Sequence, residues 1–230
     1  MSRTKRILDQ LDLKKLNNRL SELTGVEQKK EKKRQALLES AYELFTTIGY
    51  QDTTILQIAV KAGVAKGSFY NYFDDKEAIR DELIVIISSH ILTDAVNSLE
   101  RKLEDPEADG MTFPDKLVFI TDHIITNLSR DIARLKFISK SLSWGILSQS
   151  DSYRSKYGDV IDFRAFVMES LKRENIKLTS PELVIFTIIE LISSTCYSVI
   201  LSGEPVTFSD YKPYLYRCIR LLIDDATVRG

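Results

Sequence analysis

The sequence predicts an all-α fold, and three observations carry this prediction. The 230 residues include only 9 Gly and 5 Pro, far fewer turn formers than a β-sandwich or barrel of this size requires. Apolar side chains recur at helical spacing over long stretches of the chain. The hydrophobic share of 43% and the charged share of 28% are ordinary for a soluble globular protein. We therefore expect helices packed around apolar cores.

The first helices follow from this periodicity. Residues 4–24 carry regularly spaced leucines among charged residues, which predicts an amphipathic helix with Gly25 at its C-terminal cap. A second helix is expected from about residue 26 to 47, ending near Gly49. The domain organisation that we expect is an additional N-terminal helix over 1–26, a small domain over 27–80 and a larger helical domain over 81–230.

Two short helices around a tight turn come next. Thr54 can cap a helix that stops near Lys61. Gly63 lies in the following turn, where the backbone needs a conformation that side chains resist. A second short helix is expected over 65–72, and a long helix, capped by an aspartate pair, over 75–103.

The second half of the sequence predicts five further helices after a loop at 104–112, which contains Pro106 and Gly110. They are expected over 114–129, 131–147, 152–175, 181–202 and 210–227. Ser180 and Pro181 form a typical helix start, with Ser at the cap and Pro at the first helical position.

Residues 183–201 are apolar over close to the ~20 residues that span a bilayer. Glu190 lies at the centre of this stretch, and a lone carboxylate inside a membrane is costly. A helix that is apolar nearly all round is also what a buried oligomer interface needs. We therefore favour an interface between subunits over a membrane span.

Metal, disulfide and catalytic sites are not indicated. The two Cys and two His lack the spacing of zinc ligands, and both cysteines lie within apolar helical patterns. Neither a Gly-rich phosphate loop nor a supported Ser/His/Asp arrangement is present in the sequence. The first thirty residues lack the apolar core of a secretory signal, and the cysteine usage fits a reducing compartment. We expect no metal, no cofactor, no enzymatic activity and a cytoplasmic location.

The two short helices have the geometry that places a second helix in the DNA major groove. Apolar residues are expected to form the core of this helix-turn-helix: Leu44, Phe45, Ile58, Val64, Phe69 and Phe73. Small or hydrogen-bonding residues are expected to face outward, as contact with base edges and phosphates requires: Lys66, Gly67, Ser68, Tyr70 and Asn71.

Over residues 41–79 the sequence resembles the DNA-binding domain of the TetR family of bacterial regulators. The family pattern has an Ala-x-x-Leu-Phe helix, then Gly and an aromatic, Thr, Ile-Ala, Ala-Gly-Val, Gly, a Tyr-x-x-Phe end and Lys. The matching positions are Ala41, Leu44, Phe45, Gly49, Tyr50, Thr54, Ile58, Ala59, Ala62, Gly63, Val64, Gly67, Tyr70, Phe73 and Lys76. The resemblance implies an N-terminal DNA-binding domain followed by a larger helical domain for effector binding and dimerisation.

The resemblance also implies DNA contacts at matching positions, with Thr54 meeting a phosphate at a helix N-terminus. Together with residues expected from charge and position, the candidate contacts are Lys33, Thr53, Thr54, Lys66, Gly67, Ser68, Tyr70, Asn71, Tyr72 and Lys76. Tyr72 can instead close the domain with its ring, and Lys76 can be an ordinary solvated lysine. Ala65 departs from the Ser or Thr that the family often has as helix cap, so a hydroxyl contact to phosphate is in doubt.

The net charge of −1 conceals an asymmetry along the chain. Residues 1–34 hold 11 Lys/Arg against 5 Asp/Glu, whereas residues 35–230 hold 21 against 28. Residues 31–80 balance at 7 and 7, so the predicted DNA-binding domain is not a basic block. We expect the electrostatic attraction to DNA phosphates to come from the two copies of the domain in a dimer and from the basic segment 29–34. This segment can approach phosphates, or it can be a solvated helix face.

A helix-turn-helix of this kind reads one half-site, so a homodimer on a palindromic operator is expected. The resemblance implies that the helices at about 181–202 and 210–227 pair with their symmetry mates in a four-helix bundle. It also implies a pocket for a small-molecule effector, for which the candidates are His123, Phe137, Trp144, Tyr153 and Phe166. Plain core packing is the alternative for each of these side chains.

The sequence thus predicts a transcriptional repressor that a small molecule releases from double-stranded DNA. Effector binding would shift the long helix over 75–103 and change the spacing of the two recognition helices. An alternative keeps the DNA-binding domain and replaces the small molecule with a protein partner. The additional helix at 4–24 is the reason for considering this alternative.

Overall fold

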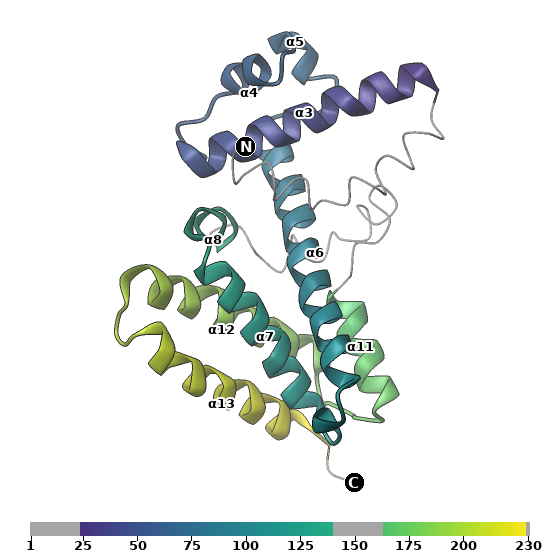
Figure 1. Ribbon diagram of the computed structural model, residues 1–230, viewed down its shortest axis with the longest axis vertical. Helices are drawn as coiled ribbons and strands as arrows, with labels where there is room; N and C mark the ends of the chain where they lie inside the picture. Colours follow the sequence, from purple (N-terminus) through teal and green to yellow (C-terminus); the bar gives the residue numbers. More distant parts are fainter. Residues whose placement is uncertain (1–23, 140–162, 229–230) are drawn as a thin grey trace. The chain divides into compact units, whose positions relative to one another are not determined.

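The computed structural model describes residues 24–139 and 163–228 (Figure 1). Within these two ranges every regular element is a helix, apart from one isolated bridge between Leu178 and Thr227. The all-α class that the sequence predicts is confirmed. The predicted helix over 4–24 lies outside the described residues.

Two compact units divide the chain between Leu83 and Ile84, close to the domain boundary predicted at residue 80. The long helix α6 (Lys76–Leu103) begins in the first unit and ends in the second. As predicted, an aspartate caps it, because the Asp75 carboxylate accepts a 2.6 Å hydrogen bond from the N–H of Ala78.

The first unit begins with α3 (Gly25–Thr47). Thr24 and Glu27 form a capping box, in which the Thr24 N–H donates to the Glu27 carboxylate at 2.9 Å and the Thr24 hydroxyl accepts from the Glu27 N–H at 3.4 Å. The prediction that Gly25 is the C-terminal cap of a preceding helix is wrong, because Gly25 is the first residue of α3 and does not adopt the left-handed conformation of such a cap.

The helix-turn-helix consists of α4 (Ile55–Lys61) and α5 (Lys66–Phe69), which lie on one side of α3 in Figure 1. Gly63 in the turn has φ +69°, the left-handed conformation that the sequence predicts there. Helix α5 is shorter than the predicted 65–72 and continues as turns to Tyr72. Ala65 at its N-cap makes no side-chain capping hydrogen bond, so α5 lacks the contact that usually stabilises a first turn.

A small apolar core holds these elements together. Ile58, Ala59 and Phe69 are fully buried, and Phe73 is 4% exposed, as the sequence predicts. The rings of Phe69 and Phe73 lie 5.7 Å apart between centroids. Val64 and Leu44, predicted for the same core, are only half-buried.

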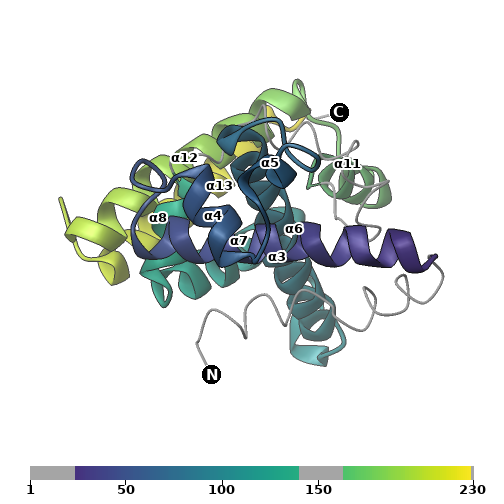
Figure 2. The same cartoon turned by 90° about the horizontal axis from the view of Figure 1, so that it is seen from above.

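The second unit adds a short 3-10 helix and five α-helices to the end of α6. They are η1 (Pro106–Ala108), α7 (Phe113–Ser129), α8 (Ile132–Ser139), α11 (Phe163–Arg173), α12 (Pro181–Ser202) and α13 (Phe208–Ala226). Helices α7, α12 and α13 run side by side in Figures 1 and 2 and contact one another. Residues 140–147 and 152–162 of the predicted helices lie outside the described ranges.

Two apolar clusters form the interior of the second unit. The larger one joins α7, α11, α12 and α13 around fully buried Leu215 and Ile219. The smaller one joins the second half of α6 to α7 through residues such as Leu92, Val96 and Ile120. The side chain of Phe166 packs against both clusters and so connects them.

Two helices are long and apolar enough to cross a membrane, judged by length and composition alone: α6 and α12. In α6, 61% of the apolar window is buried inside the structure, as in the core helix of a soluble protein. In α12 the buried share is 28%, and within the described part of the chain many of its other apolar residues are only partly buried or exposed.

Candidate nucleic-acid interface

The recognition segment, residues 66–73, consists of α5 and the turn that follows it. It presents most of the predicted contact residues to solvent. Lys66, Gly67, Tyr70 and Asn71 are exposed, and Ser68 is half-buried. A Cβ atom added at Gly67 would meet nothing within 4 Å, so the backbone is open to close approach from outside. The Tyr70 ring packs edge-on against Phe69, with 5.6 Å between centroids, while 52% of Tyr70 remains exposed. The packing directs an otherwise accessible phenol outward.

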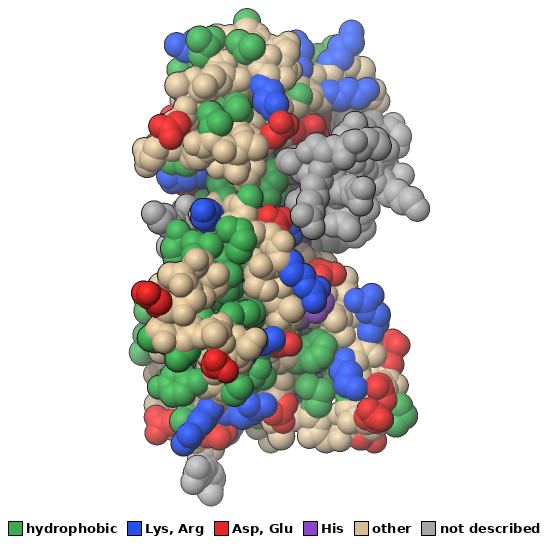
Figure 3. Space-filling view, turned by 60° about the vertical axis from the view of Figure 1, so that its left-hand side comes forward, with side chains coloured by type: hydrophobic (Ala, Val, Ile, Leu, Met, Phe, Trp, Pro, Cys, Tyr) green, Lys and Arg blue, Asp and Glu red, His purple; other side chains and the backbone are tan. Residues whose placement is uncertain are grey.

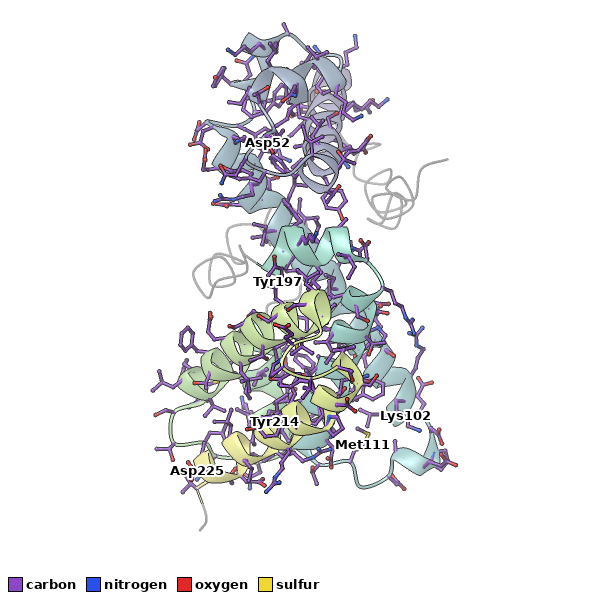
Figure 4. All side chains as sticks on the ribbon, turned by 90° about the vertical axis from the view of Figure 1, so that its left-hand side faces the viewer. Asp52, Lys102, Met111, Tyr197, Tyr214 and Asp225 are labelled. Atoms are coloured by element: carbon purple, nitrogen blue, oxygen red, sulfur yellow. The ribbon has the colours of Figure 1, made fainter. Side chains whose placement is uncertain are left out.

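The two threonines before α4 lie in different environments. Thr54 is exposed and forms a capping box with Gln57, whose N–H donates to the Thr54 hydroxyl at 3.2 Å. Thr53 is 1% exposed, and its hydroxyl donates to the carbonyl of Gly49 at 2.7 Å. Thr53 therefore stabilises the loop between α3 and α4, which Asp52 marks in Figure 4. Its burial does not support the predicted contact with DNA.

Lys76, predicted to grip the DNA backbone, is half-buried at the start of α6. Its ammonium donates to the carbonyl oxygens of Tyr50 and Thr53 at 2.9 Å each and to that of Gln51 at 3.4 Å. An ammonium has three donors, and these three carbonyls engage them. Lys76 therefore fastens the start of α6 to the loop before α4, and this placement does not support a DNA contact.

Tyr50 is the centre of the same cluster, a role that the sequence analysis missed. The Lys76 ammonium lies 4.3 Å, and the Arg80 guanidinium 4.8 Å, from the centre of the Tyr50 ring. The phenol donates to the carboxylate of Glu77. Burial and this hydrogen bond raise the pKa of Tyr50 to about 12, so the phenol stays a proton donor at neutral pH.

The basic segment on α3 divides into two parts. Lys29, Lys30, Lys32 and Lys33 are exposed on the first turns of the helix. Arg34 is only 7% exposed, and its guanidinium pairs with Glu82 of α6. The prediction that Arg34 can approach phosphates is wrong, because its side chain belongs to the buried face of α3. Its position three residues before Leu37 at helical spacing is the signal that could have shown this.

Tyr72 is half-buried, so its exposure does not decide between a contact with DNA and a ring that closes the domain. Its N–H donates to the carbonyl of Phe69 at 2.9 Å and so extends the turn after α5. A direct role in DNA contact stays a prediction for Tyr72.

The predicted effector residues are spread over the second unit. His123 of α7 lies against Asp94 of α6, with 2.8 Å between Nε2 and the carboxylate, at a solvent-exposed seam. Phe137 of α8 is 7% exposed, and Phe166 of α11 connects the two apolar clusters. Trp144 and Tyr153 lie outside the described residues.

Comparison with known proteins agrees with the geometry of the first unit. Residues 37–83 match the family model of bacterial regulatory proteins, tetR family. The chain is 24% identical over 160 residues to YhgD, an uncharacterised HTH-type transcriptional regulator of Bacillus subtilis (strain 168). This match covers 69% of this chain and 80% of YhgD. It is 34% identical over 84 residues to the HTH-type transcriptional regulator HbdR of Aromatoleum sp. (strain CIB), covering 36% of this chain and 33% of HbdR. The chain thus spans about a third of HbdR.

Two solved structures share the fold. A protein from Shewanella sp. PV-4 classed as a TetR-family transcription regulator superposes with a TM-score of 0.59 at 19% identity, covering 86% of this chain and 99% of that one. FadR of Thermus thermophilus, a TetR-family transcriptional repressor solved in complex with lauroyl-CoA, gives a TM-score of 0.54 at 21% identity, covering 86% and 96%. The helix-turn-helix and the family match over its residues show that residues 37–83 form a DNA-binding domain of the tetR family of bacterial regulatory proteins, in a chain whose all-helical fold is shared with these solved structures.

Proposed function

We propose that the protein is a homodimeric repressor that binds a palindromic operator through its helix-turn-helix and leaves it when a small molecule binds the second unit. The observation that carries this proposal is the exposure of the recognition segment. Its hydrogen-bonding side chains face solvent, whereas the neighbouring polar residues Thr53 and Lys76 are engaged inside the domain. A surface of this kind is suited to contacts with base edges and phosphates.

In the proposed complex the start of α5 enters the major groove. Gly67 lets the backbone approach closely, with Lys66 and Ser68 on either side. Tyr70 and Asn71 offer a phenol and an amide to the bases or the sugar-phosphate backbone. Thr54 stays a candidate for a phosphate contact because it is exposed.

The electrostatic part of binding is proposed for the exposed lysines of α3. The rest of the domain is close to neutral, so sequence-independent attraction to phosphates needs a separate source. Lys29, Lys30, Lys32 and Lys33 are held on a capped helix, so their backbone is ordered before DNA binds. Ordering this segment then adds little to the entropic cost of association.

We propose that α12 and α13 form the dimer interface. Leu183 and Phe186 of α12 are 65% and 40% exposed, and Tyr214 and Leu221 of α13 are 63% and 55% exposed. Each pair has helical spacing that places it on one face of its helix. Hydrophobic side chains gather over part of the second unit in Figure 3, and Tyr197 and Tyr214 mark α12 and α13 in Figure 4.

The exposed hydroxyls on α12 favour the same interface. The Thr187 hydroxyl donates to the carbonyl of Leu183 at 2.7 Å, and the Ser202 hydroxyl donates to that of Ser198 at 2.5 Å. These groups therefore need no partner from water when another helix covers them. A second copy of the chain would cover these two hydroxyls without leaving them unsatisfied.

We further propose that the effector is a small molecule with an extended apolar part, which binds in the second unit. FadR of Thermus thermophilus was solved with lauroyl-CoA, and FadR of Bacillus subtilis, which superposes with a TM-score of 0.50 at 18% identity, with stearoyl-CoA. Phe137 and Phe166 offer apolar surface in this chain, and Trp144, Tyr153 and His123 stay candidates. Lauroyl-CoA is therefore a suitable first probe.

The proposed release acts through α6, the helix shared by both units. Phe166 packs against the apolar cluster that includes Leu92 and Val96 of α6. A ligand that displaces α11 would therefore change the packing of α6. If the recognition segments of a dimer then no longer meet both half-sites together, operator affinity falls.

The test starts from genomic DNA fragments retained by the purified protein, which are sequenced to define an operator. Tyr70→Ala is expected to weaken operator binding by about tenfold or more while leaving non-specific binding unchanged. Lys33→Gln is the matched contrast: it should weaken both kinds of binding alike and lower the salt slope by about 1. Saturating lauroyl-CoA should reduce operator affinity if it is the effector. Equal operator binding by wild type and Tyr70→Ala would contradict the proposed interface.

A further inference from the structure

A buried ion pair joins three elements of the first unit. The side chains of Arg34 on α3 and Glu82 on α6 are only 8% and 6% exposed, and the guanidinium donates to the carboxylate. The same guanidinium lies 5.0 Å from the centre of the ring of Phe73, the last residue of the recognition segment. One side chain of α3 therefore touches both the end of the recognition segment and the start of α6.

Both charges occupy core-facing positions of their helices. Arg34 has helical spacing to buried Leu37 and Leu38, and Glu82 follows fully buried Ile79 by three residues. An apolar pair at these positions would be neutral or more stable, because desolvating two charges offsets most of their attraction. Gain in stability alone therefore does not account for the pair.

A guanidinium and a carboxylate differ from an apolar contact in being directional. Apolar side chains tolerate sliding and rotation between helices, whereas a guanidinium has fixed donor directions. The Arg34–Glu82 pair thus fixes the rotation of α6 relative to α3 within the first unit. Contact with Phe73 extends this constraint to the recognition segment.

The recognition segment is also constrained on its other side. Lys76 fastens the first turn of α6 to the carbonyls of Tyr50 and Thr53, which precede α4. Lys76 therefore ties the start of α6 to the loop before α4. Arg34 ties α6, through Glu82, to Phe73, which follows α5. Any rotation of α6 is then transferred to both ends of the motif.

We propose that Arg34 and Glu82 are positioning residues that hold the recognition segment in its DNA-reading orientation on α6. This inference rests on the proposed function and deepens it by naming the groups that couple α6 to the segment. The pair acts through Phe73 and touches no DNA itself.

The test is the double variant Arg34→Met/Glu82→Met, which removes both charges and leaves neither one unpaired. Amide hydrogen exchange of residues 66–73 is expected to become about tenfold faster, because the segment loses its fixed orientation. Specific operator affinity should fall by about tenfold, with non-specific binding unchanged. Unchanged exchange over 66–73 in the folded double variant would overturn the proposal.

The matched control is Lys116→Met/Glu174→Met, which removes an ion pair of the second unit with both side chains 24% exposed. Exchange over 66–73 should stay at the wild-type rate in this control, and an equal acceleration there would count against the proposal. If the first double variant does not fold, Glu82→Gln replaces it, since the amide keeps the side-chain size but loses the charge and replaces one acceptor oxygen with a donor that faces the guanidinium. Wild-type exchange over 66–73 in folded Glu82→Gln would likewise overturn the inference.

The two readouts keep this inference separate from the proposed function. If the wild-type protein retains no specific DNA fragment, the proposed function fails on that result alone. The exchange measurement needs no DNA, so it still decides whether Arg34 and Glu82 position the recognition segment.

Discussion

The two units of the molecule are held together in different ways. In the first unit a small apolar core is combined with directional contacts made by Lys76, Tyr50 and the buried Arg34–Glu82 pair. In the second unit four helices share a large apolar cluster. Directional contacts fix one arrangement, whereas apolar contacts permit several arrangements of similar energy. The first unit is therefore built to hold its recognition segment in place. The second unit is built to tolerate rearrangement of its helices.

The second unit has its own polar contacts, and several of them join α7 to α13. Asp122 of α7 accepts hydrogen bonds from Tyr216 and pairs with Lys212 of α13, and Asp115 pairs with Arg220 at 3.0 Å. These groups are partly exposed, so solvent weakens their interaction. They define how α13 lies on α7, and the Tyr216 ring also packs against the apolar cluster.

Among the variants that test this difference between the two units, Phe69→Ala is expected to have the largest effect on stability. Removing a fully buried ring from the small core is expected to cost about 3–5 kcal/mol of unfolding free energy, because a cavity is left with few neighbours to fill it. The first unit should lose its protection from hydrogen exchange while α12 and α13 keep theirs. Equal loss of protection in both units would show that they unfold together.

Lys76→Met tests the directional contacts of the first unit. Three carbonyls lose their donor, and we expect a destabilisation of about 1–3 kcal/mol with reduced operator affinity. The control is Lys61→Met, whose pair with Glu43 has side chains 37% and 43% exposed and should contribute about 0–1 kcal/mol. Denaturant unfolding measures both variants, and equal effects would remove the special role given to Lys76.

Arg220→Gln should have the smallest effect, and the effect should depend on pH. Hydrogen bonds from Thr112 and Arg220 hold the pKa of the Asp115 carboxyl below its usual range. A depressed folded pKa stabilises the protein above the unfolded pKa, and this contribution is lost as the pH falls through the folded pKa. The Tm difference between wild type and Arg220→Gln should therefore shrink below about pH 4. A difference that grows in acid would reverse the sign of this interaction.

The sequence predicted most of the fold because periodicity shows which face of a helix is buried. The spacing of Ile58, Phe69 and Phe73 located the helix-turn-helix core, and Gly63 located its turn. Periodicity does not show which partner lies across the core. The charge pattern therefore groups Arg34 with its basic neighbours as a candidate for DNA contact, although its opposite charge on α6, Glu82, also falls at a core-facing position.

The candidate site was predictable where exposure alone decides it. Lys66, Tyr70 and Asn71 face solvent because they alternate with buried Phe69 and Phe73. Thr53 and Lys76 could not be placed from the sequence, since their partners are backbone carbonyls of a loop. Helix α5 ends at Phe69, although the sequence predicts a helix to residue 72, and the Ala65 side chain provides no cap for its first turn.

The capping box of Thr24 and Glu27 has a consequence for the kinetics of the search for DNA. A disordered basic tail can reach far but must be captured in one of its many conformations. In the proposed complex, lysines that rise by about 1.5 Å per residue along a helix would meet the phosphates as a fixed array. The rate of encounter should then depend on salt, while the lifetime of each non-specific encounter stays short enough for the protein to move along the duplex.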